Sequence, residues 1–174
     1  VVAVMSSALE RSYEFYIRVS CQAKGLSPDV IEDAWKTVAA QSERQFGAFQ
    51  FLYLLDQNRP YKPDSFISEV RNKVVHRGKI VRETEALEFA EKVFKAIRDL
   101  ESILQSKFPA FVSKESDREV KAQEVQIPQG VEYLKLSTKA VTVDRTKNEV
   151  TGVVNKFIEQ VAAIHHARER GFPA

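Results

Sequence analysis

Hydrophobic positions repeat at helical spacing over most of the first hundred residues. Leu9, Tyr13, Tyr16 and Ile17 follow the spacing i, i+4, i+7 and i+8, which places them on one face of a helix. Gly25 is predicted to end this helix at about residue 24. The chain therefore begins with an amphipathic helix.

A second helix is predicted to open at Ser27-Pro28-Asp29. Serine suits the cap position, proline the first turn, and aspartate the positive end of the helix dipole. Its apolar positions, which continue to about Leu55, are Val30, Ala34, Val38, Phe46, Phe49 and Leu52. Gly47 is expected to bend this long element or to divide it in two.

Two further helices follow a turn that contains Pro60 and Pro63, because two prolines cannot both lie inside a helix. The third helix is predicted to begin near Asp64 and to end at Gly78, where a left-handed backbone is needed. The fourth is acidic at its start, apolar at every third or fourth position, and ends before Pro109. The predicted fold class is all-α, an up-and-down four-helix bundle.

Beyond the four helices, the charged segment 108–130 is predicted to be a linker, part of it helical. Residues 131–174 are predicted to form a C-terminal extension with a short strand and a long amphipathic helix over 148–170. This helix should bury its apolar face on the bundle or on a partner. Adjacent His165 and His166 diverge by about 100° on a helix, so a solvated helix end is favoured over a metal site there.

The composition of the 174 residues, 44% hydrophobic and 29% charged, is that of a soluble globular protein. Charge interrupts the apolar stretches, and Val1–Met5 lacks the basic flank of a signal peptide, so we expect a cytoplasmic protein with no membrane contact. Cys21 is the only cysteine, which excludes an intrachain disulfide. No phosphate-cradling glycine loop, nucleophile elbow or zinc-binding His-Glu-x-x-His is found.

The net charge of +2 is small, but cations are concentrated in residues 71–82. This window holds five cations and no acid, whereas the rest of the chain has 21 cations and 24 acids. The five are Arg71, Lys73, Arg77, Lys79 and Arg82. Such a patch attracts an anionic backbone such as that of RNA. The alternative is a solvated helix end, where cations complement the helix dipole.

The run Arg71-Asn72-Lys73-Val74-Val75-His76 places an arginine, a polar residue and a histidine near the end of the third helix. With the helical pattern around it, this run resembles the ribonuclease members of the HEPN family over residues 6–107. The resemblance implies a HEPN-like bundle and a homodimer in which two copies of the motif form a composite active site. It also implies a toxin, phage-defence or RNA-processing role, with a cognate antitoxin or other partner protein as a further expectation.

These residue types suit RNA cleavage without a metal or cofactor, because RNA carries its own nucleophile, the 2′-hydroxyl. His76 can move a proton near neutral pH, and Arg71 can pair with phosphate oxygens as negative charge builds. Asn72 can orient the imidazole or bind the RNA. The remaining cations, Lys73, Arg77, Lys79 and Arg82, are the predicted phosphate contacts. Products would carry a 2′,3′-cyclic phosphate or 3′-phosphate and a 5′-hydroxyl.

The geometry of an ideal helix leaves alternatives open. Asn72 and His76 would lie about 40° apart, whereas Arg71 and His76 would lie about 140° apart, unless the helix end unwinds. His76 can equally be a surface residue, Arg71 can pair with a carboxylate on a neighbouring helix, and Asn72 can serve as a cap. The competing function is a non-catalytic HEPN module that binds RNA, a nucleotide or a protein partner.

Overall fold

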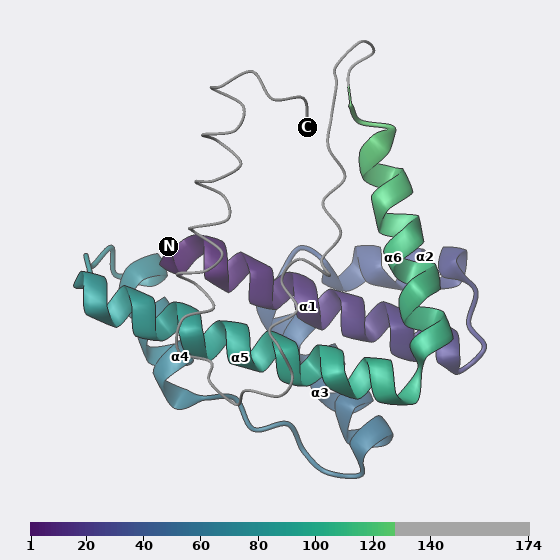
Figure 1. Ribbon diagram of the computed structural model, residues 1–174, viewed down its shortest axis with the longest axis horizontal. Helices are drawn as coiled ribbons and strands as arrows, with labels where there is room; N and C mark the ends of the chain where they lie inside the picture. Colours follow the sequence, from purple (N-terminus) through teal and green to yellow (C-terminus); the bar gives the residue numbers. More distant parts are fainter. Residues whose placement is uncertain (128–174) are drawn as a thin grey trace, which may run out of the picture. The chain divides into compact units, whose positions relative to one another are not determined.

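The computed structural model describes residues 1–127, in which every regular element is helical (Figure 1). The elements are α1 (Val2–Ala23), α2 (Pro28–Val38), α3 (Ser42–Gln57), α4 (Ser65–Arg71), the π-helical turn η1 (Asn72–His76), α5 (Glu83–Lys107) and α6 (Pro109–Glu124). The predicted all-α class is thus confirmed for this part. None of its helices is long and apolar enough to span a membrane. The predicted strand and the predicted helix over 148–170 lie outside the described residues.

Helix α1 is the centre of the unit Val1–Gln126, because it contacts each of the other helices and η1. In Figure 1 it runs alongside α5. Residues 16–20 are all buried, so neighbours cover α1 on more than one face. Arg18 is buried there with its charge compensated: Nε donates to Glu14 Oε1 over 2.9 Å, and Nη1 lies 2.8 Å from Glu32 Oε2.

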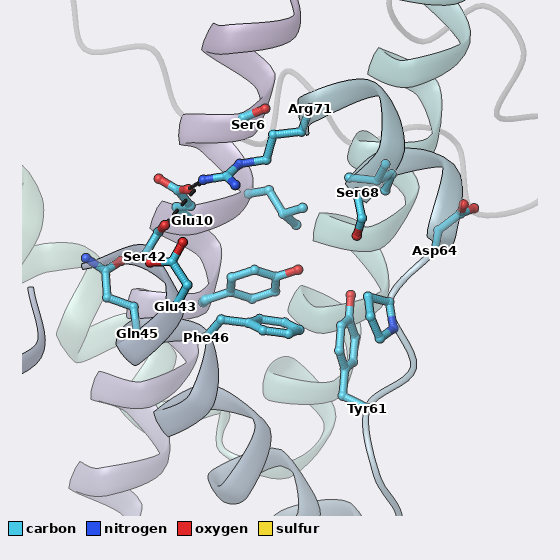
Figure 2. A pocket seen from close by; sticks show the side chains of 14 residues that line it. Ser6, Glu10, Ser42, Glu43, Gln45, Phe46, Tyr61, Asp64, Ser68 and Arg71 are labelled. Atoms are coloured by element: carbon cyan, nitrogen blue, oxygen red, sulfur yellow. Dashed lines mark hydrogen bonds and ion pairs between the residues drawn. The ribbon is translucent and has the colours of Figure 1, made fainter. Parts of the chain in front are cut away.

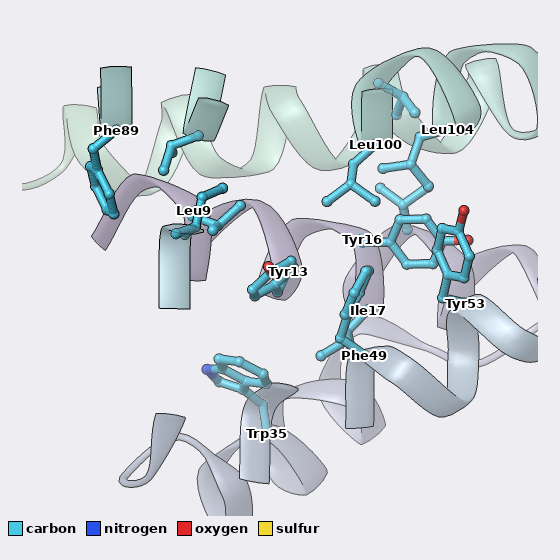
Figure 3. Close-up of a cluster of buried hydrophobic side chains, with 14 of the residues drawn as sticks. Leu9, Tyr13, Tyr16, Ile17, Trp35, Phe49, Tyr53, Phe89, Leu100 and Leu104 are labelled. Atoms are coloured by element: carbon cyan, nitrogen blue, oxygen red, sulfur yellow. The ribbon is translucent and has the colours of Figure 1, made fainter. Parts of the chain in front are cut away.

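The core is aromatic between α1 and α3 and mainly aliphatic between α1 and α5 (Figure 3). The rings of Tyr13 and Phe49 stack at 4.4 Å between centroids, and Tyr16 meets Phe49 edge to face at 5.2 Å. From α5, Leu100 and Leu104 are almost fully buried. Such aromatic pairs contribute beyond the area they bury, so they fix how α3 lies on α1.

Several predicted helix ends are confirmed. Gly25 and Gly78 have φ angles of +88° and +60°, the left-handed conformation in which glycine avoids the strain of a Cβ. Ser27 Oγ accepts from the N–H of Val30 over 3.4 Å, as expected of the cap of α2. The third helix starts at a similar cap, Asp64.

The predicted division of the second helix at Gly47 is wrong, because the break lies at residues 39–41 and Gly47 is inside α3. A single helix over the 30 residues 28–57 would be about 45 Å long, whereas the 22 residues of α1 span about 33 Å. The break lets both halves pack along α1. Trp35 of α2 contacts the Arg18 guanidinium, 5.5 Å from its ring centroid.

Most of the segment predicted as a linker, 108–130, is the helix α6, which packs against α1 and α5. Glu115 is only 1% exposed and accepts a hydrogen bond of 2.7 Å from Gln22 Nε2 of α1. Arg118 pairs with the same carboxylate, and Val112 is buried beside it. The charged composition suggested a solvated segment, but Glu115 is buried, and one of its two partners, Gln22, is supplied only by the tertiary structure.

Candidate functional site

The motif Arg71–His76 begins at the last residue of α4 and continues through η1. In a π-helical turn the backbone bonds link residues five apart, instead of four apart as in an α-helix. The 140° calculated for an ideal α-helix therefore does not apply to Arg71 and His76. The π-helical turn ends at His76, and just beyond Gly78 the N–H of Lys79 donates to the carbonyl of Lys73 over 3.0 Å.

Arg71 is held by the side chains of two other helices. Its Nη2 donates to Glu10 Oε1 of α1 over 2.7 Å and to Ser42 Oγ of α3 over 3.3 Å. The side chains of Arg71 and Glu10 are 26% and 35% exposed, so the pair lies at the surface of the unit. This confirms the alternative in which Arg71 pairs with a carboxylate on a neighbouring helix. Both contacts use Nη2, and within residues 1–127 the Nε and Nη1 atoms make no hydrogen bond.

The other two motif residues face solvent. His76 and Asn72 are exposed, and neither lines the pocket to which Arg71 contributes. Asn72 is the C-cap of α4 and the first residue of η1, as the alternative role of a cap predicted, and its backbone is in the right-handed helical conformation. One copy of the chain thus presents an accessible imidazole and a guanidinium that is engaged by Glu10.

The predicted phosphate contacts divide into two groups. Lys73 lies 2.8 Å from Glu69 and 3.7 Å from Glu85, and the hydrogen bond with Glu69 raises the pKa of the Lys73 ammonium. Its charge is therefore partly neutralised. The remaining cations are exposed and form no ion pair within the part of the chain that the structure describes: Arg77, Lys79 and Arg82.

A pocket of about 160 Å³ lies beside Arg71, between α1, α3, α4 and the connection before α4 (Figure 2). Its residues are Ser6, Leu9, Glu10, Tyr13, Ser42, Glu43, Gln45, Phe46, Tyr61, Pro63, Asp64, Ile67, Ser68 and Arg71. Figure 2 shows Arg71 and Glu10 at one side, with Phe46 and Tyr61 at the other. The pocket thus combines aromatic faces with charged groups.

The aromatic side of this pocket is built by Tyr13, Phe46 and Tyr61. The Tyr13 ring lies 5.2 Å from Phe46 and 6.1 Å from Tyr61, centroid to centroid. Burial raises the pKa of the Tyr13 hydroxyl far above its ordinary value, and the hydrogen bond with Tyr61 adds to this. Burial likewise raises the pKa of Tyr61. Both hydroxyls are therefore neutral at physiological pH.

Sequence reasoning missed Glu10, Ser42 and Ser6 as parts of the site. Ser6, Glu10 and Tyr13 lie at helical spacing on α1, and this was the signal that could have grouped them. No local signal links Ser42 to Arg71, since 29 residues separate them. The partner of Arg71 could be identified only after the helices were placed.

Within residues 1–127, no group of three or more His, Cys, Asp or Glu side chains is placed to hold a metal ion. Comparisons with models of protein families, with curated proteins and with solved structures found no match to this chain.

Proposed function

We propose that the chain is a metal-independent endoribonuclease of HEPN type, in which Arg71 and His76 act with the help of Asn72. The observation that carries the proposal is the π turn between the arginine and the histidine. Such turns are rare in proteins, and many of those that are found lie at functional sites. Here the turn lies between the two motif residues, and the imidazole is accessible.

In the proposed reaction, the His76 imidazole removes the proton of a ribose 2′-hydroxyl. The 2′-oxygen then attacks the adjacent phosphorus, the bond to the 5′-oxygen breaks, and that oxygen takes up a proton from a general acid. The products are a 2′,3′-cyclic phosphate and a 5′-hydroxyl. Arg71 stabilises the additional negative charge on the phosphoryl oxygens, and Asn72 orients the imidazole or the RNA.

The general acid and the second guanidinium are proposed to come from another copy of the chain. A homodimer would place two motifs across one cleft, with Arg77, Lys79 and Arg82 as exposed contacts for the RNA backbone. In this proposal α1, α3, α4 with η1, and α5 form a HEPN-like four-helix arrangement. A cytoplasmic toxin, phage-defence or RNA-processing effector, with or without an antitoxin, is the setting that fits the proposal.

A second candidate function is a non-catalytic HEPN module that binds RNA, a nucleotide or a protein partner. The contact that favours it is the 2.7 Å ion pair between Arg71 and Glu10, because a neutralised guanidinium stabilises a transition state less well. In this function the cations of residues 77–82 hold a ligand and His76 moves no proton.

The decisive experiment is cleavage of mixed structured and single-stranded RNAs in EDTA. His76→Ala should slow cleavage by about 100- to 10,000-fold, the usual contribution of general acid–base catalysis, and Arg71→Ala should also abolish most activity. The controls are His165→Ala and Arg59→Ala, which remove the same residue types outside the motif. Folding and oligomeric state are measured for every variant.

Two results would contradict the nuclease proposal. The first is cleavage that persists in folded His76→Ala protein, or on RNA whose 2′-hydroxyls are methylated. The second is no cleavage of any RNA by the intact protein while binding is retained, which would favour the binding module.

A further inference from the structure

The pocket beside Arg71 has the size of a site for one aromatic ring. Its volume is about 160 Å³, and an apolar cavity of about 150 Å³ in another protein holds a single benzene molecule. A whole nucleotide or a drug-sized ligand would not fit, since their pockets are several times larger. The ligand enclosed here must be a small planar group attached to something that remains outside.

Two aromatic side chains line the pocket, and either ring can stack on such a group. Phe46 and Tyr61 are both partly exposed, and their rings meet edge to face at 6.2 Å between centroids. Every nucleobase has a π face that stacks on such rings, which is how many proteins bind single-stranded nucleic acids. The polar remainder of the pocket therefore decides which base fits.

The polar lining is rich in hydrogen-bond acceptors. Ser6 is 7% exposed, and its Oγ is buried with no hydrogen-bond partner within residues 1–127. A buried hydroxyl left without a partner is costly, so a ligand that reaches it gains a hydrogen bond at a place already desolvated. Glu10 and Glu43 add carboxylate oxygens. Carboxylates accept from exocyclic amino groups, as in their contacts with N4 of cytosine.

The position of Arg71 suggests what lies outside the pocket. Its Nη2 is engaged by Glu10 and Ser42, whereas Nε and Nη1 make no hydrogen bond within the described part. Each of these two atoms can donate one charge-assisted hydrogen bond to a phosphate oxygen. A base in the pocket and its neighbouring phosphate on this guanidinium would be parts of the same chain of nucleotides.

We propose that this pocket binds one unpaired cytosine of single-stranded RNA, next to the phosphate that Arg71 holds. Cytosine combines the single ring that the volume admits with the amino group that the acceptors favour. The base must be unpaired, because a base in a helix is stacked and its pairing edge is concealed. The proposal deepens the proposed function, on which it rests through Arg71, by naming the substrate class.

The test is to titrate the full-length protein separately with CMP, UMP and ribose 5-phosphate. Binding is measured from the changes in NMR chemical shifts. CMP should bind about ten-fold more tightly than ribose 5-phosphate, the effect of one stacked base, and more tightly than UMP. Ser6→Val removes the buried hydroxyl and narrows the pocket by a methyl group, and Phe46→Leu removes a stacking face, so each should weaken CMP binding about ten-fold. Ser7→Val is the control, because Ser7 is exposed on the same helix and does not line the pocket.

Equal affinities for CMP and ribose 5-phosphate, or equal CMP binding by Ser6→Val and Ser7→Val, would overturn the proposal. If Ser6→Val does not fold, Phe46→Leu gives the same decision. A cytosine-containing single-stranded RNA should displace CMP, whereas the same strand in a duplex should not. If neither form of the RNA displaces CMP, the pocket is a site for free nucleotides and the proposal is wrong. CMP binding by a protein that cleaves no RNA would support the pocket and refute the nuclease, and cleavage without base-dependent binding would do the reverse.

Discussion

Replacing Glu10 by glutamine should increase the affinity of the protein for RNA. The Glu10 carboxylate lies 2.7 Å from Arg71 Nη2 and cancels part of the positive charge that a phosphate would meet. Glutamine keeps an acceptor for the hydrogen bond but removes the negative charge. The same change should lower the free energy of unfolding only slightly, by about 0.2–1 kcal/mol, because the pair is partly exposed.

The magnitude follows from Coulomb's law. Two unit charges 4 Å apart interact by about 1 kcal/mol in water and by about 4 kcal/mol at an effective dielectric constant of 20. Because the guanidinium would lie between Glu10 and the phosphate, these two negative charges would be farther apart than about 4 Å, so we use the lower value. Removing the repulsion between Glu10 and a phosphate on Arg71 should therefore tighten binding by about 1 kcal/mol, or roughly five-fold.

The assay is fluorescence anisotropy at low salt with a single-stranded RNA whose 2′-hydroxyls are methylated, so that no cleavage occurs. Glu43→Gln is the matched control, because Glu43 lines the same pocket but forms no ion pair within residues 1–127. Its effect should be smaller. Unchanged or weaker binding by Glu10→Gln, or the same gain when Arg71 is also replaced by glutamine, would show that Arg71 does not contact the phosphate.

Three further predictions concern stability, measured by urea unfolding. Gly78→Ala should cost about 1–2 kcal/mol, because φ is +60° there, whereas Gly47→Ala, with open space around a helical glycine, should stabilise by about 0.5–1 kcal/mol; equal effects would refute the reasoning. Phe89→Ala should cost about 3–5 kcal/mol, since this side chain is fully buried. The hydrogen bond from Lys92 lowers the pKa of Asp64 in the folded protein. The Asp64–Lys92 pair therefore stabilises the folded state at pH values above the Asp64 pKa of the unfolded chain, and this stabilisation is lost as the pH falls through the Asp64 pKa of the folded protein. Lys92→Met should reduce the loss of unfolding free energy at acid pH, and an unaltered pH dependence of that free energy would contradict this prediction.

Local chemistry accounts for the elements that could be predicted. The apolar stripe of α1 and the cap at Ser27 depend on residues within a few positions of each other. The positive φ angles at Gly25 and Gly78 also follow from local backbone preferences. Such features do not require contacts with distant segments of the chain, which is why they can be predicted from the sequence.

Other features depend on contacts between distant segments. The break at residues 39–41 lets α2 and α3 both pack against α1, and α6 is stabilised by the hydrogen bond between Gln22 and Glu115, 93 residues apart. No composition or periodicity encodes those distances. The predicted division at Gly47 and the predicted linker over 108–130 were local inferences about elements that packing decides.

The candidate site shows the same division. The sequence alone determined the motif, its cations, and the end of its helix at Gly78, because residue identity and helical spacing are local properties. Only the tertiary structure decided that Arg71 pairs with Glu10 and lines an aromatic pocket, and that a π turn separates it from His76. The physical reason is that the charge, exposure and shape of a site come from groups that folding brings together from distant positions in the chain.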